Sequence, residues 1–383
     1  MNSATITVDE VQTNASSDWA VQAPLVSIGI LAWNEEKSIG AALETLFQQS
    51  IFARLGQRGQ RCEVVFVGNG CTDGTADIVA KTFADQTHRH PQRDWFECRQ
   101  LNLQERGKLN AWNRYIHSIS AREADYIFLM DADILINGPD TLWNMLTALE
   151  ADPQAMIATD QPCKDISHKR RKSLSDRFSL SASHMTSAGS AQLCAQLYCI
   201  RAETARHIYL PKDLSACEDG FIKWVVCTDF LMHDANPGRI ICVPEASHTF
   251  EAYTSFGSIL KNQKRQMIGQ ALVHVLIDEY LPTLTPSERK NLATTLRDKD
   301  HRDPLWLKRL IADHVKKSRP FWRLIPGLVG FRFQRLAKMK GLRKITCLPV
   351  TLAGFAMSML TCFMAHGFLK QGSIAYWPHA KGK

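Results

Sequence analysis

Two aspartates separated by one residue form the strongest chemical signal in the sequence. Asp131 and Asp133 directly follow the apolar run YIFLM at 126–130. Residues two apart on an extended chain project to the same side, so both carboxylates would face one ligand. Two close negative charges at the end of a buried strand are unfavourable unless a cation lies between them. Because Mg²⁺ binds one or two carboxylates together with substrate phosphates, the pair predicts a metal site. The alternative is that both aspartates cap the next helix.

Polar side chains also end the first two apolar runs of the chain. Asn34 and Glu35 follow the run at 26–32 and are candidates to contact a nucleotide base or ribose. Alternatively, Glu35 is simply an acid in the first turn of a helix. Asn69 and Gly70 form a turn signal after the second run. Such a turn needs no function, but its position beside the first loop would give Asn69 access to the same ligand.

Cationic and amide side chains on two predicted helices are candidates to bind phosphate. Lys108 lies near a helix start, where the helix dipole favours an anion. This misfit indicates a phosphate partner, and a solvated lysine is the alternative. Gln263 and Arg265 lie on a later predicted helix. A guanidinium can hold a diphosphate through paired hydrogen bonds, and the alternative for this pair is an ordinary exposed helix face.

Asp219 is the candidate general base. Ser215 and Glu218 fit a capping box, which accounts for Glu218 but leaves Asp219 unexplained. A carboxylate whose pKa is shifted toward neutrality by burial can take a proton from a substrate. His248 follows the strand-like run IICVP. We interpret it as an ordinary loop histidine, with an additional metal ligand as the alternative.

The elements that must position these residues form an α/β pattern. Strands that alternate with helices imply parallel pairing and right-handed crossovers. YIFLM is apolar throughout, as expected for a strand covered on both faces. In such sheets ligands bind at the carboxyl ends of the strands, so the polar residues above are predicted to converge there. The predicted strands are 26–32, 63–67, 96–101, 126–130, 156–159 and 192–200; the predicted helices are 36–50, 74–86, 106–120, 139–150, one from near Ser215, and a helical region at 255–315 with a capping box at Thr285–Glu288.

The composition is that of a globular protein with one locally charged segment. The 383 residues are 45% hydrophobic and 22% charged, and the net charge is +8. Ten Lys and Arg residues, and no acidic residue, lie between 316 and 344; without these ten, 36 basic residues stand against 38 acidic ones. Outside this segment and a second basic patch at 164–177, no basic surface that could bind nucleic acid is expected. The 11 cysteines form no CxxC pair, which argues against a zinc ribbon or a disulfide framework and for a reducing compartment.

An uncharged stretch at 345–369 follows the basic segment. It exceeds the roughly 20 apolar residues that a spanning helix needs, and it also contains Pro349 and Gly354. We predict membrane association, with the flanking cations on the cytoplasmic side. A spanning helix, a re-entrant or interfacial helix, and a buried helical hairpin remain open at this point.

The motifs, in this order and at these spacings, resemble glycosyltransferase family 2. The resemblance runs from about 26 to about 270. The sequence departs from the family pattern at two places. Gly68-Asn69 replaces the usual acidic pair of the second loop. Processive polymer synthases have a motif that ends in Arg-Trp, and this tryptophan is missing after Arg265. The matching segments are Trp33-Asn34-Glu35, the loop GNGCTDGT at 68–75, Gly107-Lys108 with Ala111 and Asn113, Asp131-Ala132-Asp133, Glu218-Asp219 and, in part, Gln263 to Met267.

This resemblance implies a GT-A fold, which is a Rossmann-like mixed sheet flanked by helices, and a metal-dependent, inverting transfer from a nucleotide-diphosphate sugar, expected to be UDP-linked. It implies that Asp133 holds Mg²⁺ or Mn²⁺, that Asp131 contacts the ribose and assists the metal, and that Asp219 is the base. The remaining implied contacts are a nucleotide site lined by Asn34, Glu35, Asn69 and Lys108, and closure over the diphosphate by Gln263 and Arg265.

The predicted enzyme acts at the cytoplasmic face of the inner membrane on a glycan or lipid-linked acceptor, in cell-envelope or exopolysaccharide synthesis. A polyprenyl-phosphate acceptor and a catalytically silent membrane-bound scaffold are the alternatives, and no nucleic acid is expected as a partner. The predicted organisation is a disordered tail at 1–24 that is not a signal peptide, a catalytic domain at 25–255, a helical extension at 256–315, a basic amphipathic segment at 316–344, a hydrophobic membrane segment at 345–369 and a tail at 370–383.

Overall fold

The computed structural model describes residues 12–13, 24–168, 193–253, 255–339 and 341–372. The chain divides into two compact units. The first comprises 1–168, 190–208 and 236–251, and the second comprises 169–189, 209–235 and 252–383. The tails predicted at 1–24 and 370–383 lie almost entirely outside the described residues.

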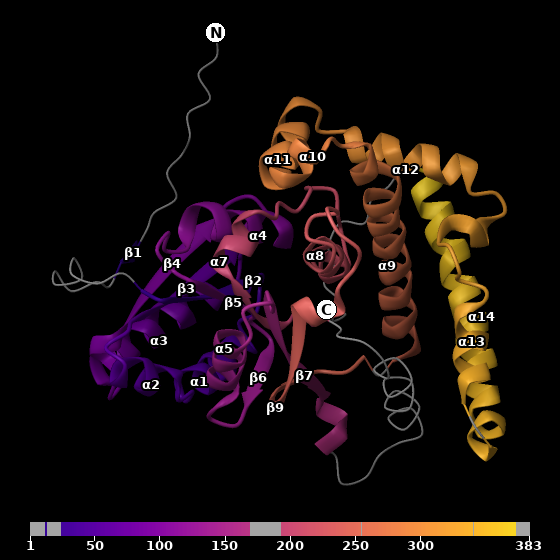
Figure 1. Cartoon of the computed structure of the whole chain (residues 1–383). Coiled ribbons are helices and arrows are strands. Elements are labelled where there is room, and N and C mark those ends of the chain that lie inside the picture. The colour runs from indigo at the N-terminus through magenta and orange to yellow at the C-terminus, as the bar shows by residue number, and fades with distance from the viewer. Residues whose placement is uncertain (1–11, 14–23, 169–192, 254, 340, 373–383) are drawn as a thin grey trace. The chain divides into compact units, whose positions relative to one another are not determined.

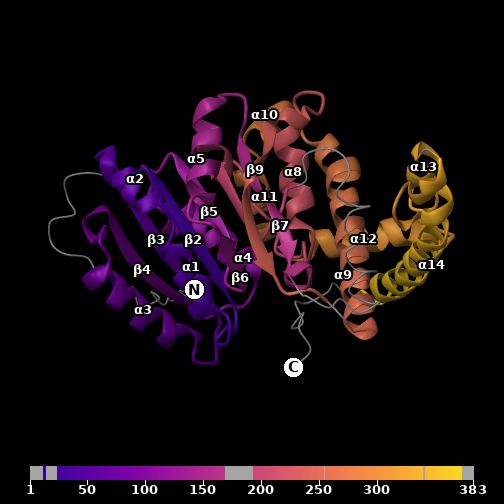
Figure 2. The same cartoon turned by 90° about the horizontal axis from the view of Figure 1, so that it is seen from below.

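Parallel strands form one half of the sheet in the first unit (Figure 1). β2 pairs in parallel with β3 and β5, and β3 pairs in parallel with β4. Every residue of β2 and β3 is buried, as expected for strands covered on both faces. Helix α3 lies against β3 and β4 (Figure 2). The elements of this half are β2 (Val26–Ala32), α1 (Ile39–Phe47), α2 (Ile51–Gln57), β3 (Cys62–Asn69), α3 (Thr75–Arg89), β4 (Phe96–Leu103), α4 (Lys108–Arg114) and β5 (Tyr126–Asp131).

The sheet becomes mixed beyond β5. There β8 pairs antiparallel with β5 and β7, β6 pairs antiparallel with β9, and β7 runs parallel to β9. Over the described residues the strand order is β1-β4-β3-β2-β5-β8-β7-β9-β6. This mixed sheet flanked by helices confirms the predicted fold class. The further elements are β1 (Gln12–Thr13), β6 (Ile134–Asn137), α5 (Thr141–Ala151), β7 (Ile157–Lys164), β8 (Leu197–Arg201), α7 (Ala202–Arg206) and β9 (Ile240–Phe250).

A buried glutamate ties the parallel strands together. Glu63 on β3 is fully buried and forms an ion pair with Arg99 on β4. Glu63 Oε1 accepts hydrogen bonds from Ser27 Oγ on β2 at 2.5 Å and from the Ala121 amide at 2.7 Å. Because a buried carboxylate is tolerated only when its lone pairs are satisfied, these contacts fix two neighbouring strands and the chain after α4 around one charge.

The helix predicted at 106–120 is shorter than expected. It ends as α4 at Arg114, and a π-helical turn follows over Tyr115–Ile119. The Tyr115 hydroxyl lies 2.6 Å from Ser27 Oγ, and a Cβ at Gly29 would lie 2.2 Å from the Tyr115 ring. Only a glycine therefore lets the ring reach this hydroxyl. Burial, followed by the negative charge of Glu63, raises the pKa of Tyr115 well above its usual value.

The second unit is helical among its described residues. α10 begins with the predicted capping box, in which Thr285 Oγ1 accepts from the Glu288 amide and Pro286 occupies the first helical position. The helical region predicted at 255–315 is confirmed. The helices are α8 (Glu218–Cys227), α9 (Phe256–His274), α10 (Pro286–Lys290), α11 (Leu292–Arg302), α12 (Trp306–Lys317), α13 (Phe331–Lys338) and α14 (Leu342–Lys370), with a π turn at Val275–Tyr280.

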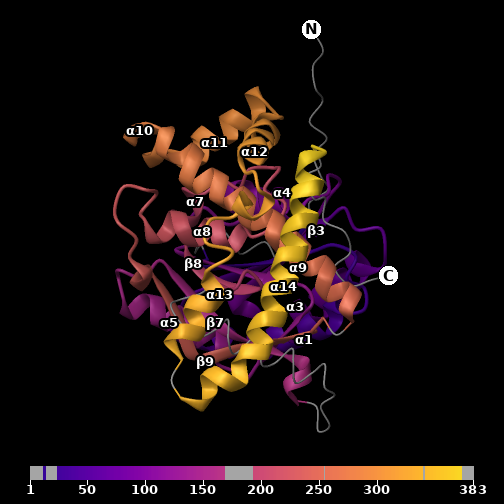
Figure 3. The ribbon, with the colours of Figure 1, turned by 90° about the vertical axis from the view of Figure 1, so that its right-hand side faces the viewer.

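The last helix, α14, contains the uncharged stretch. It packs along α9 and α13 in the second unit (Figure 3). In the part of the chain that the structure describes, only Lys344–Lys370 is long and apolar enough to cross a membrane. Its exposed side chains include several large apolar ones, among them Ile345 (69% exposed) and Phe363 (62%). The side chains that it buries are mostly small or polar: Thr351, Ser358, Thr361, Cys362, Ala365 and Leu369.

Replacing Glu63 with alanine should destabilise the first unit strongly. The substitution leaves the Arg99 cation and the Ser27 hydroxyl without their shared partner, which costs about 3–5 kcal/mol for a buried pair. Urea denaturation followed by tryptophan fluorescence measures the change in the free energy of unfolding. Glu44→Ala, an exposed glutamate on α1, is the matched control. Equal stability of the two variants would show that the Glu63 contacts do not hold the strands.

Candidate active site

The carboxyl ends of three parallel strands meet at one edge of the first unit. Ala32 at the end of β2 stands opposite Gly68 on β3, and Leu31 stands opposite Asp131 on β5. The loops that carry Asn34, Glu35, Asn69 and Asp133 follow directly from these positions. The structure therefore places the polar residues of the first unit at the edge where the strand pattern predicts them.

Lys108 and Asp131 form an ion pair at this edge. Lys108 Nζ lies 2.8 Å from Asp131 Oδ1, and the two side chains are 17% and 21% exposed. The alternative of a solvated lysine is therefore wrong. The pair places a cation beside the first aspartate of the motif, where it offsets charge that would otherwise repel a second carboxylate or a phosphate.

Asn69 holds the start of the helix that carries Lys108. The Gly107 amide donates to Asn69 Oδ1 at 2.7 Å, and Asn69 is 7% exposed. Gly107 precedes α4 with a φ of 145°, a value that favours glycine. The hydrogen bond from Gly107 to Asn69 and the backbone conformation of Gly107 thus fix the start of α4, where Lys108 lies.

Asn34 and Glu35 join the first loop to the second. Asn34 has a φ of 54°, and its Oδ1 accepts from the Thr72 amide at 2.8 Å. The Glu35 amide donates to Thr75 Oγ1 at 2.8 Å, and Glu35 Oε2 accepts from Ser38 Oγ at 2.5 Å. Since α1 begins only at Ile39 with no acid in its first turn, the alternative of a first-turn acid is wrong for Glu35.

The two aspartates of the motif lie in different local structures. Asp131 is the last residue of β5, whereas Asp133 lies in the turn that leads to β6. The extended-chain geometry that we assumed for the pair is therefore wrong, because the strand ends at Asp131. The capping alternative is also wrong: β6 intervenes, and α5 begins at Thr141 with Asp140 at its N-cap position.

The oxygen ligands of this pair fit a hard divalent cation. Mg²⁺ and Mn²⁺ prefer carboxylate oxygens and complete their shells with water or substrate phosphates. Among the described residues, Asp131 and Asp133 belong to no group in which three His, Cys, Asp or Glu side chains converge. A cation held here would thus draw its remaining ligands from outside this pair.

Asp219, Gln263 and Arg265 belong to the second unit. Asp219 lies in the first turn of α8, whose N-cap residue is Cys217 in a left-handed conformation. The predicted capping box with Ser215 is wrong, because the helix begins at Glu218 and the buried Ser215 Oγ forms no hydrogen bond among the described residues.

The start of α8 packs closely against α9. Cys217 Sγ lies 3.1 Å from Gln266 Oε1 on α9, and a Cβ at Gly269 would lie 2.7 Å from the Ala216 backbone. Burial raises the pKa of the Cys217 thiol above its usual value, the charges of Asp219 and Glu218 raise it further, and Arg265 opposes them. Glu218, Asp219 and Arg265 therefore all lie close enough to the Cys217 thiol to influence its pKa.

Some contacts of the site have no counterpart in the sequence-based predictions. Thr72 and Thr75 anchor the first loop. The Arg106 guanidinium lies 5.4 Å from the Trp33 ring centroid. The GNGCTDGT loop contains both threonines, so their role in joining the loops could have been inferred from the family resemblance. The contact of Arg106 joins distant segments, and no local pattern indicates it.

His248 does not lie in a loop. It is part of β9, opposite Ile136 on β6, and is fully buried. His248 Nδ1 lies 2.6 Å from Asp160 Oδ2 on β7. The prediction of an ordinary loop histidine is therefore wrong, and His248 is a buried side chain with a carboxylate partner.

Residues 27–197 match the family model described as "Glycosyl transferase family 2". Residues 27–197 are thus a glycosyltransferase family 2 domain. This domain identifies the chain as a glycosyltransferase, which confirms the enzyme class that the motifs predict. No curated protein matches the chain.

Comparison with solved structures finds matches at low sequence identity. The mannosyltransferase PcManGT from Pyrobaculum calidifontis, solved with GDP-Man and Mn²⁺, is 18% identical with a TM-score of 0.47 over 92% of this chain and 86% of its own. S. aureus TarS 1-349 is 15% identical with a TM-score of 0.44 over 91% and 92%. Glucosyl-3-phosphoglycerate synthase from Mycobacterium tuberculosis, solved with Mn²⁺, UDP-glucose and phosphoglyceric acid, is 10% identical with a TM-score of 0.44 over 69% and 82%.

Replacing Asn69 with alanine should destabilise the loop before α4. The Gly107 amide would lose its acceptor, at a cost of about 1–3 kcal/mol for an unsatisfied buried donor. Chemical denaturation measures the change, and hydrogen exchange at residues 105–110 localises it. Asn69→Asp, which keeps an acceptor oxygen, should retain most of the stability. Wild-type exchange in Asn69→Ala would contradict this role.

Proposed function

We propose that this enzyme transfers a sugar, with inversion, from a nucleotide-diphosphate sugar to a glycan or lipid-linked acceptor. The proposed setting is cell-envelope or exopolysaccharide synthesis, and the proposed nucleotide is uridine, by family resemblance. The observation that carries the proposal is the Lys108–Asp131 pair at the carboxyl ends of the parallel strands, within the family-matched domain. This edge presents a cation, carboxylates and amides in the place where α/β sheets bind nucleotides.

The first unit binds the nucleotide in this proposal. Asn34, Glu35 and Asn69 line the base and ribose end of the site, although Asn69 Oδ1 and Asn34 Oδ1 also fasten the loops. Lys108 offsets the charge of the diphosphate. Asp133 holds Mg²⁺ or Mn²⁺, and Asp131 assists the metal and contacts the ribose. When bound, the cation stabilises the negative charge that develops on the leaving nucleotide.

The second unit supplies the base. Asp219 takes the proton of an acceptor hydroxyl while the oxygen forms a bond to the anomeric carbon from the face opposite the departing diphosphate. The bond from the anomeric carbon to the diphosphate oxygen breaks, so the products are the glycosylated acceptor and the nucleoside diphosphate. Gln263 and Arg265 contact the diphosphate, and Arg265 influences the same thiol as Asp219.

We further propose that α14 docks this enzyme on the cytoplasmic face of the inner membrane. A helix of a water-soluble protein buries its large apolar residues, whereas α14 exposes Ile345 and Phe363 and buries Ser358 and Thr361. Large apolar side chains that face outward beside the basic segment at 316–344 fit an anionic lipid surface.

Contacts within the second unit favour docking at the surface over spanning. Arg332 on α13 donates to Ser358 Oγ at 3.1 Å, near the middle of the apolar stretch. A charged side chain at the centre of a bilayer costs roughly 2.5–3.5 kcal/mol or more. At the interface, by contrast, its guanidinium can stay near the head groups. An interfacial helix also brings the enzyme to a lipid-linked acceptor.

Asp219→Asn should reduce sugar transfer by roughly 10²–10⁴-fold, because the acceptor proton loses its base. Transfer is measured as incorporation of labelled sugar into a membrane extract. Donor binding is measured by thermal shift with UDP-, GDP- and CMP-sugars, with and without Mn²⁺, and should change little. Asp234→Asn, an exposed aspartate beyond α8, is the control. Retained transfer in Asp219→Asn would favour a phosphate acceptor, and absence of donor binding in the wild type would refute the proposed donor class.

Phe363→Asp should weaken binding to vesicles that contain phosphatidylglycerol by roughly 10–100-fold, since one buried aromatic side chain contributes about 1.5–3 kcal/mol. Co-sedimentation measures binding. Leu135→Asp, at an apolar residue of the first unit that is 40% exposed, should bind like the wild type. Wild-type protein that stays in the supernatant with these vesicles would show that α14 is not a membrane-docking helix.

A further inference from the structure

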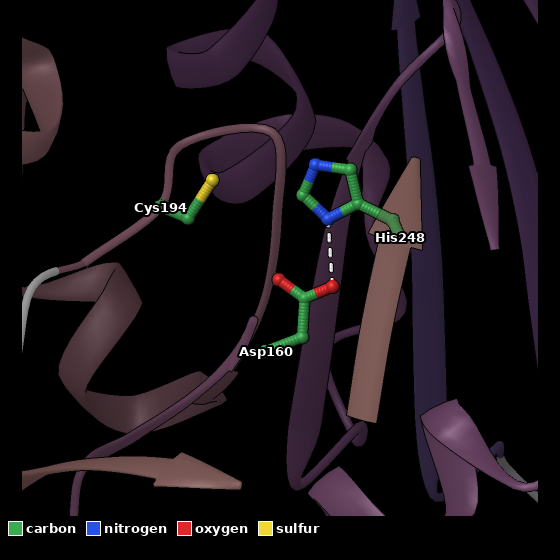
Figure 4. Close-up of side chains that lie close together, drawn as sticks. All are labelled: Asp160, Cys194 and His248. Carbon is green, nitrogen blue, oxygen red and sulfur yellow. Dashed lines mark hydrogen bonds and ion pairs between the residues drawn. The ribbon is translucent and has the colours of Figure 1, made fainter. Parts of the chain in front are cut away.

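Three side chains from distant segments, none of them assigned to the site above, converge inside the first unit (Figure 4). They are Asp160 on β7, Cys194 in the loop before β8, and His248 on β9, and one ligand atom of each lies within 4.8 Å of the others. We propose that they form a second metal site, specific for a zinc-like cation and structural in role.

A register shift places Asp160 in this cluster. Along β7, Thr159 stands opposite Cys242 of β9, whereas Gln161 already stands opposite Ser247. Such bulges interrupt the regular alternation of a strand and redirect a side chain. Asp160 lies at this irregularity, between Thr159 and Gln161, and is only 2% exposed.

The buried carboxylate of Asp160 is incompletely compensated by the described residues. Its Oδ2 lies 2.6 Å from His248 Nδ1, but its buried Oδ1 accepts no hydrogen bond from them. In Figure 4 this second oxygen faces the side on which Cys194 Sγ lies. A buried acceptor without a partner costs about 1–3 kcal/mol, and more when it is charged. A cation between Asp160 and Cys194 would remove this cost.

The donor set indicates which cation fits. A thiolate, an imidazole and a carboxylate suit Zn²⁺, whereas Mg²⁺ and Mn²⁺ prefer oxygen ligands alone. Gln196 Oε1 lies 3.3 Å from His248 Nε2 and 4.0 Å from Cys194 Sγ, so a fourth donor is close. Four donors of this kind describe a closed site, which is the form that structural zinc takes.

This second site would position Asp131 without touching substrate. The Asp131 amide donates to the Gln196 carbonyl at 2.8 Å, and the Cys194 amide donates to Thr159 Oγ1 at 3.2 Å. The loop of Cys194 and Gln196 therefore connects β7 to the end of β5. A metal that fixes this loop also fixes the backbone from which Asp131 projects.

Metal content of the full chain tests the proposal. Protein purified without chelators should contain near-stoichiometric zinc by plasma mass spectrometry. Cys194→Ser and His248→Gln should bind Zn²⁺ at least 10–100-fold more weakly, measured in competition with a chromophoric chelator. Loss of a residue that only hydrogen-bonds to a metal ligand already lowers metal affinity by about this factor. Cys163→Ser, a part-buried cysteine of β7 outside the cluster, should keep its zinc. Asp133→Asn should also keep it while losing transfer, which separates this site from the substrate metal.

A second measurement needs only the wild-type chain. Co²⁺ added to zinc-depleted protein should give thiolate-to-cobalt charge-transfer absorption, and either metal should slow alkylation of Cys194, mapped by mass spectrometry. Protein that takes up neither Zn²⁺ nor Co²⁺ would leave Asp160 and His248 as a metal-free ion pair and overturn the proposal. Unchanged Zn²⁺ affinity in Cys194→Ser would overturn it as well.

Discussion

In strands that are buried on both faces, uncompensated polar and charged side chains are tolerated only at the strand ends. The arrangement of the first unit depends on this constraint. β2 and β3 are buried along their whole length, so a charge within them must be compensated internally. Glu63 is the one charged residue of these two strands, and Arg99 together with several hydrogen bonds compensates it. The Lys108–Asp131 ion pair, by contrast, lies at the carboxyl edge, where these strands end.

The same constraint explains why so much of the first unit could be predicted from the sequence. An apolar run bounded by polar residues defines both a buried strand and the point at which it ends, and β2 spans the predicted 26–32. The amides and charges at Asn34, Asn69 and Lys108 follow because strand ends meet at one edge. Family resemblance then supplied the chemistry that spacing alone left open.

The errors arise where tertiary contacts override local pattern. Asp133 lies in a turn because β6, a four-residue strand, pairs with distant β9, and no periodicity reveals so short a strand. His248 looked like a loop residue after a proline, yet β9 continues through it to Phe250. The convergence of Asp160 and Cys194 on His248 depends on a register shift between strands far apart in sequence, which a single sequence does not encode locally.

The hydrogen bond from the Asp131 amide to the Gln196 carbonyl has a physiological consequence if both metals bind. A cell starved of zinc would lose the support of this loop and hence glycosylation capacity, even with manganese and donor sugar in abundance. The supply of a metal that never meets the substrate would then limit the rate of sugar transfer.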